Sequence, residues 1–168
     1  PIFLILFIII YFEDGFPIIF KQKRVGINYT FFNIYKFRSM KKNTPNVATH
    51  LLENTNQYLL KIGKFIRKTS LDELPNLINI VKGEMVFVGP RPALYNQDDL
   101  MEFRMATGVS KLKPGITGWA QINGRDDLPI AQKVQLDVEY LERQSFFFDM
   151  KILWITALKV LARDGVSH

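Results

Sequence analysis

Two adjacent carboxylates, Asp72 and Glu73, are the residues of this 168-residue chain best suited to chemistry. They lie at the N-terminus of a predicted helix that runs to Lys82 and stops at Gly83. Acidic residues in a first helical turn commonly only complement the helix dipole, a contribution of ~0.3–1 kcal/mol. Here the surrounding sequence favours a functional interpretation, because basic residues flank the pair in the chain or are expected to approach it from a strand end: Lys36, Arg38, Arg67 and Lys68.

Cations beside a helix N-terminus form a site suited to phosphate. We expect the dipole to favour the anionic form of a carboxylate in such a site, which suits a nucleophile. Two acidic side chains also provide the oxygen ligands that Mg²⁺ accepts together with phosphate oxygens. Asp72 and Glu73 are therefore candidates both for catalysis and for a metal site.

Two turn-rich segments carry further candidate residues. In Gly89-Pro90-Arg91-Pro92, two prolines restrict the backbone around one arginine. This suits either a rigid turn with a solvated side chain or an arginine presented to an anion or a planar ring. The second segment runs from Lys113 through Gly115 and Gly118 to Arg125, and its glycines are expected to permit close approach of the backbone to a ligand.

The composition narrows the possible chemistry. The sequence has no cysteine and only His50 and His168 as histidines. This excludes disulfides, Cys-ligated zinc, iron–sulfur clusters and thiol nucleophiles, and it leaves little room for a Ser-His-Asp triad. Lys+Arg number 22 against 16 for Asp+Glu, a net charge of +6 that suits nucleic acid, anionic lipid or phosphorylated small molecules. Nucleic acid is the least favoured, because no basic run interleaved with aromatic residues lies on a predicted helix.

Apolar periodicity and turn residues predict the elements that hold these groups. Strands are predicted at 18–24, 30–37 and 85–88, and helices at 51–66, 72–82, 94–107, about 130–141 and 146–163. Ser70 and Glu73 have capping-box spacing, although a helix beginning at Asp72 would place Pro75 better in the first turn. Ser145 is expected to cap the last helix. The fold class predicted is α+β, mostly helical.

The first twelve residues, PIFLILFIIIYF, carry no charge. A bilayer-spanning helix needs ~20 apolar residues, so this run is too short to cross alone. It suits half of a spanning helix, one arm of a membrane-entering hairpin, a signal-peptide remnant or a core helix. The absence of a polar face weakens the last alternative. The final predicted helix is also strongly apolar but carries four charged residues, which suits an interfacial or core-packed helix.

Several long motifs occur in a fixed order along the chain. They are KFRSM (36–40), Arg67 followed by SLDELPNLINIVKGEM (70–85), FVGPRP (87–92), KPGITGWAQINGR (113–125) and LDVEYL (136–141). In these motifs the chain resembles the bacterial sugar transferase family, and more closely its small monotopic phosphoglycosyl transferases. The resemblance covers essentially the whole sequence.

The resemblance implies transfer of a phosphosugar from a UDP-sugar to polyprenyl (undecaprenyl) phosphate, with release of UMP, as the first membrane step of glycan or glycoconjugate assembly. It implies that Asp72 forms a covalent aspartyl-phosphosugar intermediate, that Glu73 is its partner, and that both help to hold Mg²⁺. It assigns Lys36 and Arg67 to phosphate binding. To nucleotide-sugar binding it assigns Pro90, Arg91, Pro92 and Arg125.

The resemblance also implies a monotopic arrangement at the cytoplasmic face of the bacterial inner membrane. Members of the family have an N-terminal helix that enters the membrane and turns back at a Ser-Pro break, and Pro1 matches that proline. Residues 1–12 are then expected to be the second arm of a re-entrant helix, and 13–168 a cytoplasmic catalytic domain with amphipathic interfacial helices. Two other hypotheses are a catalytically silent membrane scaffold in a glycan-assembly complex, and a basic domain that binds anionic lipid or nucleic acid.

Overall fold

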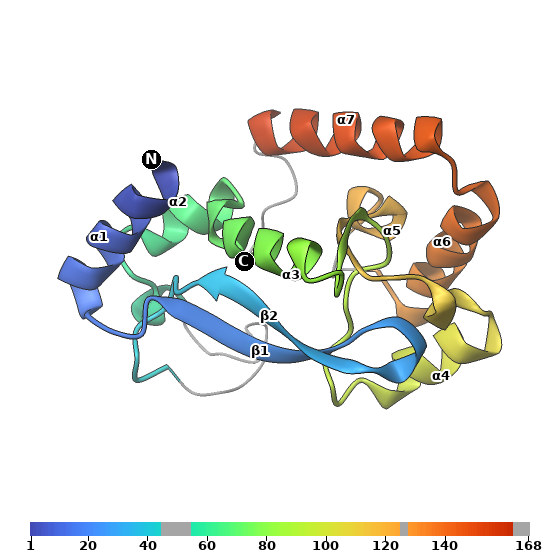
Figure 1. Ribbon diagram of the computed structural model, residues 1–168, viewed down its shortest axis with the longest axis horizontal. Helices are drawn as coiled ribbons and strands as arrows, with labels where there is room; N and C mark the ends of the chain where they lie inside the picture. The colour runs from blue at the N-terminus through green and yellow to red at the C-terminus, as the bar shows by residue number, and fades with distance from the viewer. Residues whose placement is uncertain (45–54, 125–127, 163–168) are drawn as a thin grey trace.

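A computed structural model describes residues 1–44, 55–124 and 128–162 of the chain. A long β-hairpin lies along one side of the molecule and helix α7 along the opposite side, with α2, α3 and α5 between them (Figure 1). The predicted α+β class with mostly helical content is confirmed. The strands are β1 (Ile19–Val25), β2 (Phe31–Phe37), β3 (Val86–Val88) and β4 (Gly115–Thr117).

The predicted pair of N-terminal strands is confirmed as an antiparallel hairpin. β1 pairs with β2 in a register that runs from Ile19 opposite Phe37 to Val25 opposite Phe31. The short 3-10 helix η1 (Ile27–Tyr29) closes the hairpin, and Asn28 in its centre has a φ of 49°. This register places Lys36 near the end of β2 that faces away from the hairpin turn.

β3 and β4 form a parallel pair whose chains approach closely because three glycines lie where they meet. The Gly89 amide donates to the Thr117 carbonyl at 2.9 Å, and the Gly115 amide donates to the Pro90 carbonyl at 2.9 Å. A Cβ atom at Gly89 would lie 2.5 Å from the Lys113 carbonyl oxygen, and one at Gly118 would overlap the Gly89 carbonyl. These glycines thus permit two segments of the chain to meet, and the approach to a ligand expected from the sequence stays a prediction.

Most of the predicted helices are present. Their bounds are α1 (Ile2–Asp14), α2 (Gly63–Lys68), α3 (Leu77–Val81), α4 (Asp98–Ala106), α5 (Trp119–Ile122), α6 (Ile130–Arg143) and α7 (Phe146–Ala162), and the remaining 3-10 helices are η3 (Thr55–Tyr58), η4 (Leu71–Asn76) and η5 (Val109–Lys111). The expected cap of the last helix is confirmed, because the Ser145 hydroxyl accepts from the Phe148 amide at 3.3 Å.

The prediction of one helix over 51–66 is wrong for the part that the structure describes. Only η3 and the start of α2 are helical there. Leu59 instead forms an antiparallel bridge with Met40, and the Leu60 amide donates to the Ser39 carbonyl at 3.0 Å. Backbone bonds to the segment that follows β2 therefore replace the helical bonds that the apolar periodicity suggested.

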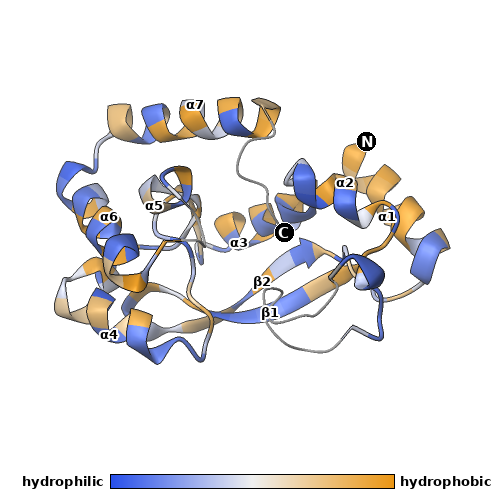
Figure 2. Cartoon of the chain, turned by 180° about the vertical axis from the view of Figure 1, so that it is seen from behind, coloured by the Kyte–Doolittle hydropathy of each residue, from blue (hydrophilic) through white to orange (hydrophobic). Residues whose placement is uncertain are grey.

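Helix α1 packs on the domain through one narrow face. Leu6 and Ile10 are buried against Ile18, Phe37 and Ile66, whereas the other large apolar side chains of the helix are exposed. Figure 2 shows this helix as almost continuously hydrophobic, while α7 alternates between hydrophobic and hydrophilic residues. The exposed apolar residues of α7 are Phe146, Phe147, Met150, Trp154, Leu158 and Leu161.

None of the helices within the described residues has the length and apolar character needed to cross a bilayer.

The buried Arg38, which directly follows β2, holds the C-terminal end of α1. Its Nη2 donates to the carbonyls of Asp14 (3.1 Å) and Gly15 (2.6 Å), and its Nη1 lies 2.9 Å from Asp14 Oδ2. The apolar arm is thus fastened to the strand that carries Lys36.

Candidate active site

The two predicted catalytic carboxylates lie in the first turn of η4, directly after α2. Ser70 separates the two helices and has left-handed backbone angles (φ 55°), so the chain changes direction there. The predicted capping box is wrong, because the Ser70 side chain makes no cap hydrogen bond and the Glu73 carboxylate lies elsewhere. Glu73 Oε1 accepts from Lys36 Nζ at 2.6 Å, and both side chains are only about one-fifth exposed (19% and 21% for Lys36 and Glu73).

Asn79 on α3 fixes the approach of the dyad to β2. This side chain is fully buried, and its Nδ2 donates to the Asn33 carbonyl and to Glu84 Oε2, each at 2.7 Å. Its Oδ1 accepts from the Tyr35 amide at 3.3 Å. Asn79 therefore joins α3 to β2 next to Lys36, a role that the sequence motif contains but that helical periodicity alone did not reveal.

The direction of the pKa shift of Asp72 differs from the sequence-based expectation. Burial raises the pKa of its carboxyl to about 6, against a usual value of 3.8. Lys36 and Arg67 oppose that rise, while the neighbouring Glu73 adds to it. The expected stabilisation of the anion by a helix dipole is overcome, because η4 is a single short 3-10 segment and the loss of solvent is the larger effect.

Arg67 lies at the end of α2 and is electrostatically coupled to Asp72. Burial lowers the pKa of its guanidinium, and the negative charge of Asp72 acts against this change. Arginine remains charged even so. The structure thus brings together Asp72, Glu73, Lys36 and Arg67, four residues that are separated by up to 37 positions in the chain.

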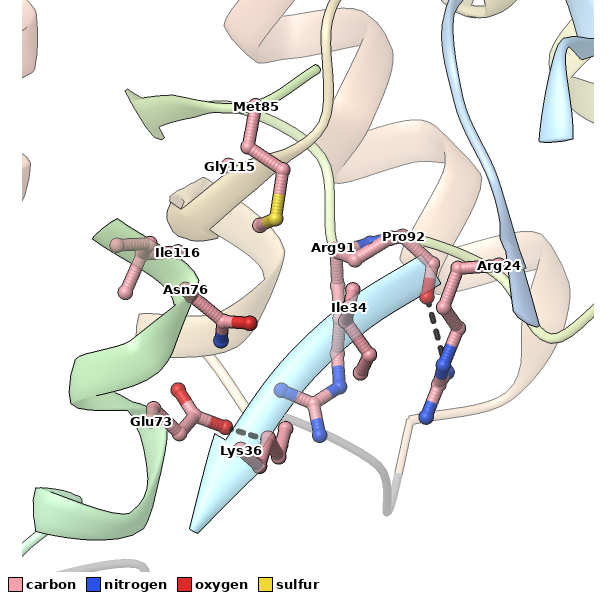
Figure 3. Close-up of a pocket in the computed structure, with 10 residues that line it drawn as sticks. All are labelled: Arg24, Ile34, Lys36, Glu73, Asn76, Met85, Arg91, Pro92, Gly115 and Ile116. Atoms are coloured by element: carbon pink, nitrogen blue, oxygen red, sulfur yellow. Dashed lines mark hydrogen bonds and ion pairs between the residues drawn. The ribbon is translucent and has the colours of Figure 1, made fainter. Parts of the chain in front are cut away.

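A shallow, open pocket adjoins this cluster (Figure 3). Of the predicted residues it is lined by Lys36, Glu73, Arg91 and Pro92. The Arg91 side chain extends towards Lys36 and Glu73 (Figure 3). The other lining residues are Arg24, Ile34, Asn76, Met85, Gly115 and Ile116.

The remaining predicted site residues lie around the pocket or beyond the described part of the chain. Pro90 is buried and lines a second hollow behind the Gly-Pro-Arg-Pro loop. Arg125 falls outside the described residues, so its predicted role in binding a nucleotide-sugar stays a prediction.

Two further pocket residues were missed by the sequence analysis. Arg24 Nη1 donates to the Pro92 carbonyl at 3.0 Å, which connects β1 with the arginine-bearing loop. Asn76 is 3% exposed, and its Oδ1 has no hydrogen-bond partner in the portion of the protein that the structure describes. The turn residues around Arg91 and the polar position three residues after Glu73 were the available signals, but neither indicates burial.

The dyad fits Mg²⁺ in the chemistry of its donors. Mg²⁺ commonly takes one or two carboxylates and completes its octahedron with water and substrate phosphate. Asp72 and Glu73 provide such oxygens, although Lys36 already occupies one oxygen of Glu73. Over the described ranges no set of three or more His, Cys, Asp or Glu side chains is arranged to hold a metal.

Residues 1–163 match the model of a protein family described as bacterial sugar transferase. The chain belongs to this family. Its known relatives include the uncharacterized sugar transferase EpsL of Bacillus subtilis, which is 44% identical over 154 residues. That alignment covers 92% of this sugar transferase chain and 75% of the relative.

Two other relatives have names that state an activity. The undecaprenyl-phosphate galactose phosphotransferase of Salmonella typhimurium is 40% identical, over 91% of this chain and 35% of the relative. The UDP-glucose:undecaprenyl-phosphate glucose-1-phosphate transferase of Escherichia coli is 43% identical, over 85% of this chain and 32% of the relative. This sugar transferase chain thus spans about a third of the length of those two proteins.

The raised pKa of Asp72 predicts that its ionised carboxylate lowers the free energy of unfolding at neutral pH. The folded protein binds more protons than the unfolded chain between pH 3.8 and about 6, so the contribution of Asp72 to the free energy of unfolding falls as pH rises through this window. We expect Asp72→Asn to increase the free energy of unfolding at pH 7.5 by ~1–3 kcal/mol, and by much less at pH 4. Urea unfolding at both pH values measures this difference.

Asp98→Asn is the matched control, because Asp98 is an exposed aspartate in the first turn of α4. We expect no stabilisation from that change at either pH. Equal stability of the Asp72→Asn variant and the parent protein at pH 7.5 would show that the carboxyl is well solvated.

Proposed function

We propose that the chain transfers a phosphosugar from a UDP-sugar to undecaprenyl phosphate, forming an undecaprenyl-diphosphate sugar and releasing UMP. The proposal rests on one structural observation: a carboxyl with a pKa of about 6 lies among Lys36, Glu73 and Arg67, beside a pocket into which Arg91 extends. Phosphoryl transfer needs an in-line nucleophile and cations around the transferred group, and this cluster contains both. The names of the Salmonella and Escherichia coli relatives support the same substrate classes.

Asp72 is the proposed nucleophile. One oxygen of its carboxylate attacks the sugar-bearing phosphorus of the UDP-sugar, while the bond from that phosphorus to the bridging oxygen breaks and UMP leaves with the electron pair. An oxygen of undecaprenyl phosphate then attacks the phosphorus of the aspartyl-phosphosugar, and the carboxylate of Asp72 is regenerated. A pKa near 6 keeps the nucleophile ionised at neutral pH and more basic than an ordinary aspartate.

The basic residues of the site are proposed to bind different parts of the substrate. Lys36 and Arg67 lie next to the dyad and would neutralise oxygens of the transferred phosphoryl group. Arg91 and the lining of the pocket beside Pro92 would hold the nucleotide-sugar, and Arg125 is proposed to join them. Because Glu73 holds Lys36 at 2.6 Å, it also sets where that cation meets the substrate.

Asp72 and Glu73 are proposed to hold Mg²⁺ together with the substrate phosphates. When bound, the ion supplies charge neutralisation on the phosphate oxygens.

We also propose that the protein acts at the cytoplasmic face of the bacterial inner membrane. The exposed apolar residues of α1 and α7 suit contact with lipid, and the net charge of +6 suits anionic headgroups. The polar contacts of α7 lie against the domain, where Thr156 pairs with Thr117 at 2.8 Å and Lys159 Nζ donates to the Ile122 carbonyl at 2.6 Å. Phe148 and Ile152 are buried on the same side, and the exposed apolar residues of α7, Trp154 and Leu161 among them, lie outside these contacts.

Removal of the nucleophile provides the first test. Asp72→Asn is expected to abolish the phosphosugar adduct and to reduce UMP release roughly 10³-fold or more, because an amide does not attack phosphorus. Intact-protein mass spectrometry after mixing with UDP-sugars, without the lipid acceptor, measures the adduct. The control is Asp98→Asn, which should form the adduct as the parent does; a full adduct on the Asp72→Asn variant would exclude Asp72 as the nucleophile.

Chelation provides the second test. Excess EDTA is expected to stop UMP release, and added Mg²⁺ should restore it, because without the ion the two anionic carboxylates would face the negative phosphates directly. Binding can be measured without turnover, since Mg²⁺ in the presence of UDP should raise the melting temperature of the parent but much less that of Asp72→Asn. UMP release that continues unchanged in EDTA would contradict the metal site.

Vesicle binding provides the third test. The chain has two tryptophans, of which Trp154 is 67% exposed on α7, whereas Trp119 donates its indole N–H to Glu139 Oε2. Anionic vesicles are expected to shift the fluorescence emission to shorter wavelength in the parent, and to do so far less in Trp154→Phe. An emission spectrum of the parent that does not respond to vesicles would argue against contact of α7 with lipid.

A further inference from the structure

A buried ion pair connects α4 and α6 behind the Gly-Pro-Arg-Pro loop. Arg104 Nε and Nη2 donate to Asp137 Oδ2 at 3.0 and 2.6 Å. The residues are 5% and 2% exposed, so both charges are removed from water. Burial raises the pKa of Asp137, and the Arg104 guanidinium opposes the rise.

Stability alone is a weak reason for such a pair. Replacement of a buried ion pair by apolar residues of similar volume often leaves a protein as stable as before, because taking two charges out of water is costly. The pair does, however, present a third donor in a defined direction. Arg104 Nη1 donates to the carbonyl of Arg91 at 2.9 Å.

A second side chain on α6 holds the same loop three residues further along the helix. The hydroxyl of Tyr140 contacts the Val88 carbonyl at 3.1 Å and Asp149 Oδ1 at 2.8 Å. Tyr140 is 1% exposed. Residues at positions i and i+3 share one face of a helix, so Asp137 and Tyr140 act from the same side of α6. Tyr140 thus contacts the backbone at Val88 directly, while Asp137 acts on the backbone at Arg91 through Arg104 of α4.

We infer that Arg104, Asp137 and Tyr140 are positioning residues that set the direction of Arg91 towards the dyad. They contact the backbone of the loop directly or through one another, while the Arg91 side chain extends into the pocket (Figure 3). Pro90 and Pro92 remove much of the remaining backbone freedom. The role given to Arg91 rests on the proposed function, whereas the restraint on the loop does not.

The main test replaces the ion pair by apolar residues. The double variant Arg104→Met, Asp137→Leu is expected to fold, with a melting temperature near that of the parent, but to lose the bond to the Arg91 carbonyl. Its KM for the UDP-sugar should rise about 10- to 100-fold, with a smaller change in kcat, since a misdirected arginine weakens donor binding. A KM within about twofold of the parent, measured where Arg91→Ala does raise KM, would overturn the inference.

A second variant covers the case in which the double variant does not fold. Arg104→Lys keeps a charge for Asp137 but has no planar fork to reach the Arg91 carbonyl as well. We expect the same rise in KM from Arg104→Lys. The matched control is Arg143→Lys, because Arg143 pairs with Glu139 on the exposed side of α6, and its KM should stay that of the parent. Equal KM values for the two lysine variants would contradict the positioning role.

Hydrogen exchange separates this inference from the proposed function. Backbone amides within 86–93 should exchange faster in the double variant and in Tyr140→Phe than in the parent, with or without a substrate. If the parent releases no UMP from any UDP-sugar, the proposed function fails, but this measurement still decides whether the loop is restrained from α6. Unchanged exchange in both variants would overturn the inference.

Discussion

The contact between η4 and β2 is the constraint on which the candidate site depends. It brings the Lys36 ammonium within 2.6 Å of Glu73, and it leaves the adjacent Asp72 partly buried, with a pKa of about 6. The two effects balance each other. Burial alone would raise the pKa of Asp72 so far that the carboxyl would stay protonated at neutral pH. The cations alone would lower its pKa and make it a weakly basic and weakly nucleophilic carboxylate. Asn79 maintains this balance, because it bonds β2 and α3 together six residues beyond Glu73.

The other half of the site depends on backbone contact rather than on charge. The Gly89 and Gly115 amides both take part in the bonding between β3 and β4, and a side chain at Gly89 or Gly118 would force the strands apart. The close packing of these chains brings the loop with Arg91 next to the dyad. The two halves meet at the pocket, so a phosphate bound there would be positioned by elements from most of the chain.

Much of this arrangement was predictable from the sequence, and the exceptions have physical reasons. Strong local signals identified the hairpin, α6 and α7, a weaker one identified α4, and the motifs identified Asp72, Glu73 and Arg91. The helix predicted over 51–66 failed because Leu59 and Leu60 bond to residues next to β2, a tertiary contact that periodicity does not contain. The direction of the Asp72 pKa shift failed for a similar reason, because a sequence shows that a carboxylate is near a helix terminus but not how much water surrounds it. The roles of Arg104 and Asp137 were likewise hidden, since charged residues on amphipathic helices ordinarily face solvent.

Arg38 links the position of helix α1 to the position of the catalytic dyad. It holds the end of α1 through the Asp14 and Gly15 carbonyls, and it stands two residues after Lys36. If α1 lies in lipid, the depth of α1 in the bilayer therefore determines the height of the dyad above the acyl chains. The diphosphate of a soluble donor and the phosphate of a lipid-anchored acceptor would then meet at a height above the acyl chains that the contact between Arg38 and α1 sets. A bilayer of different thickness or headgroup packing would change the reach of the acceptor while leaving the chemistry of Asp72 as it is.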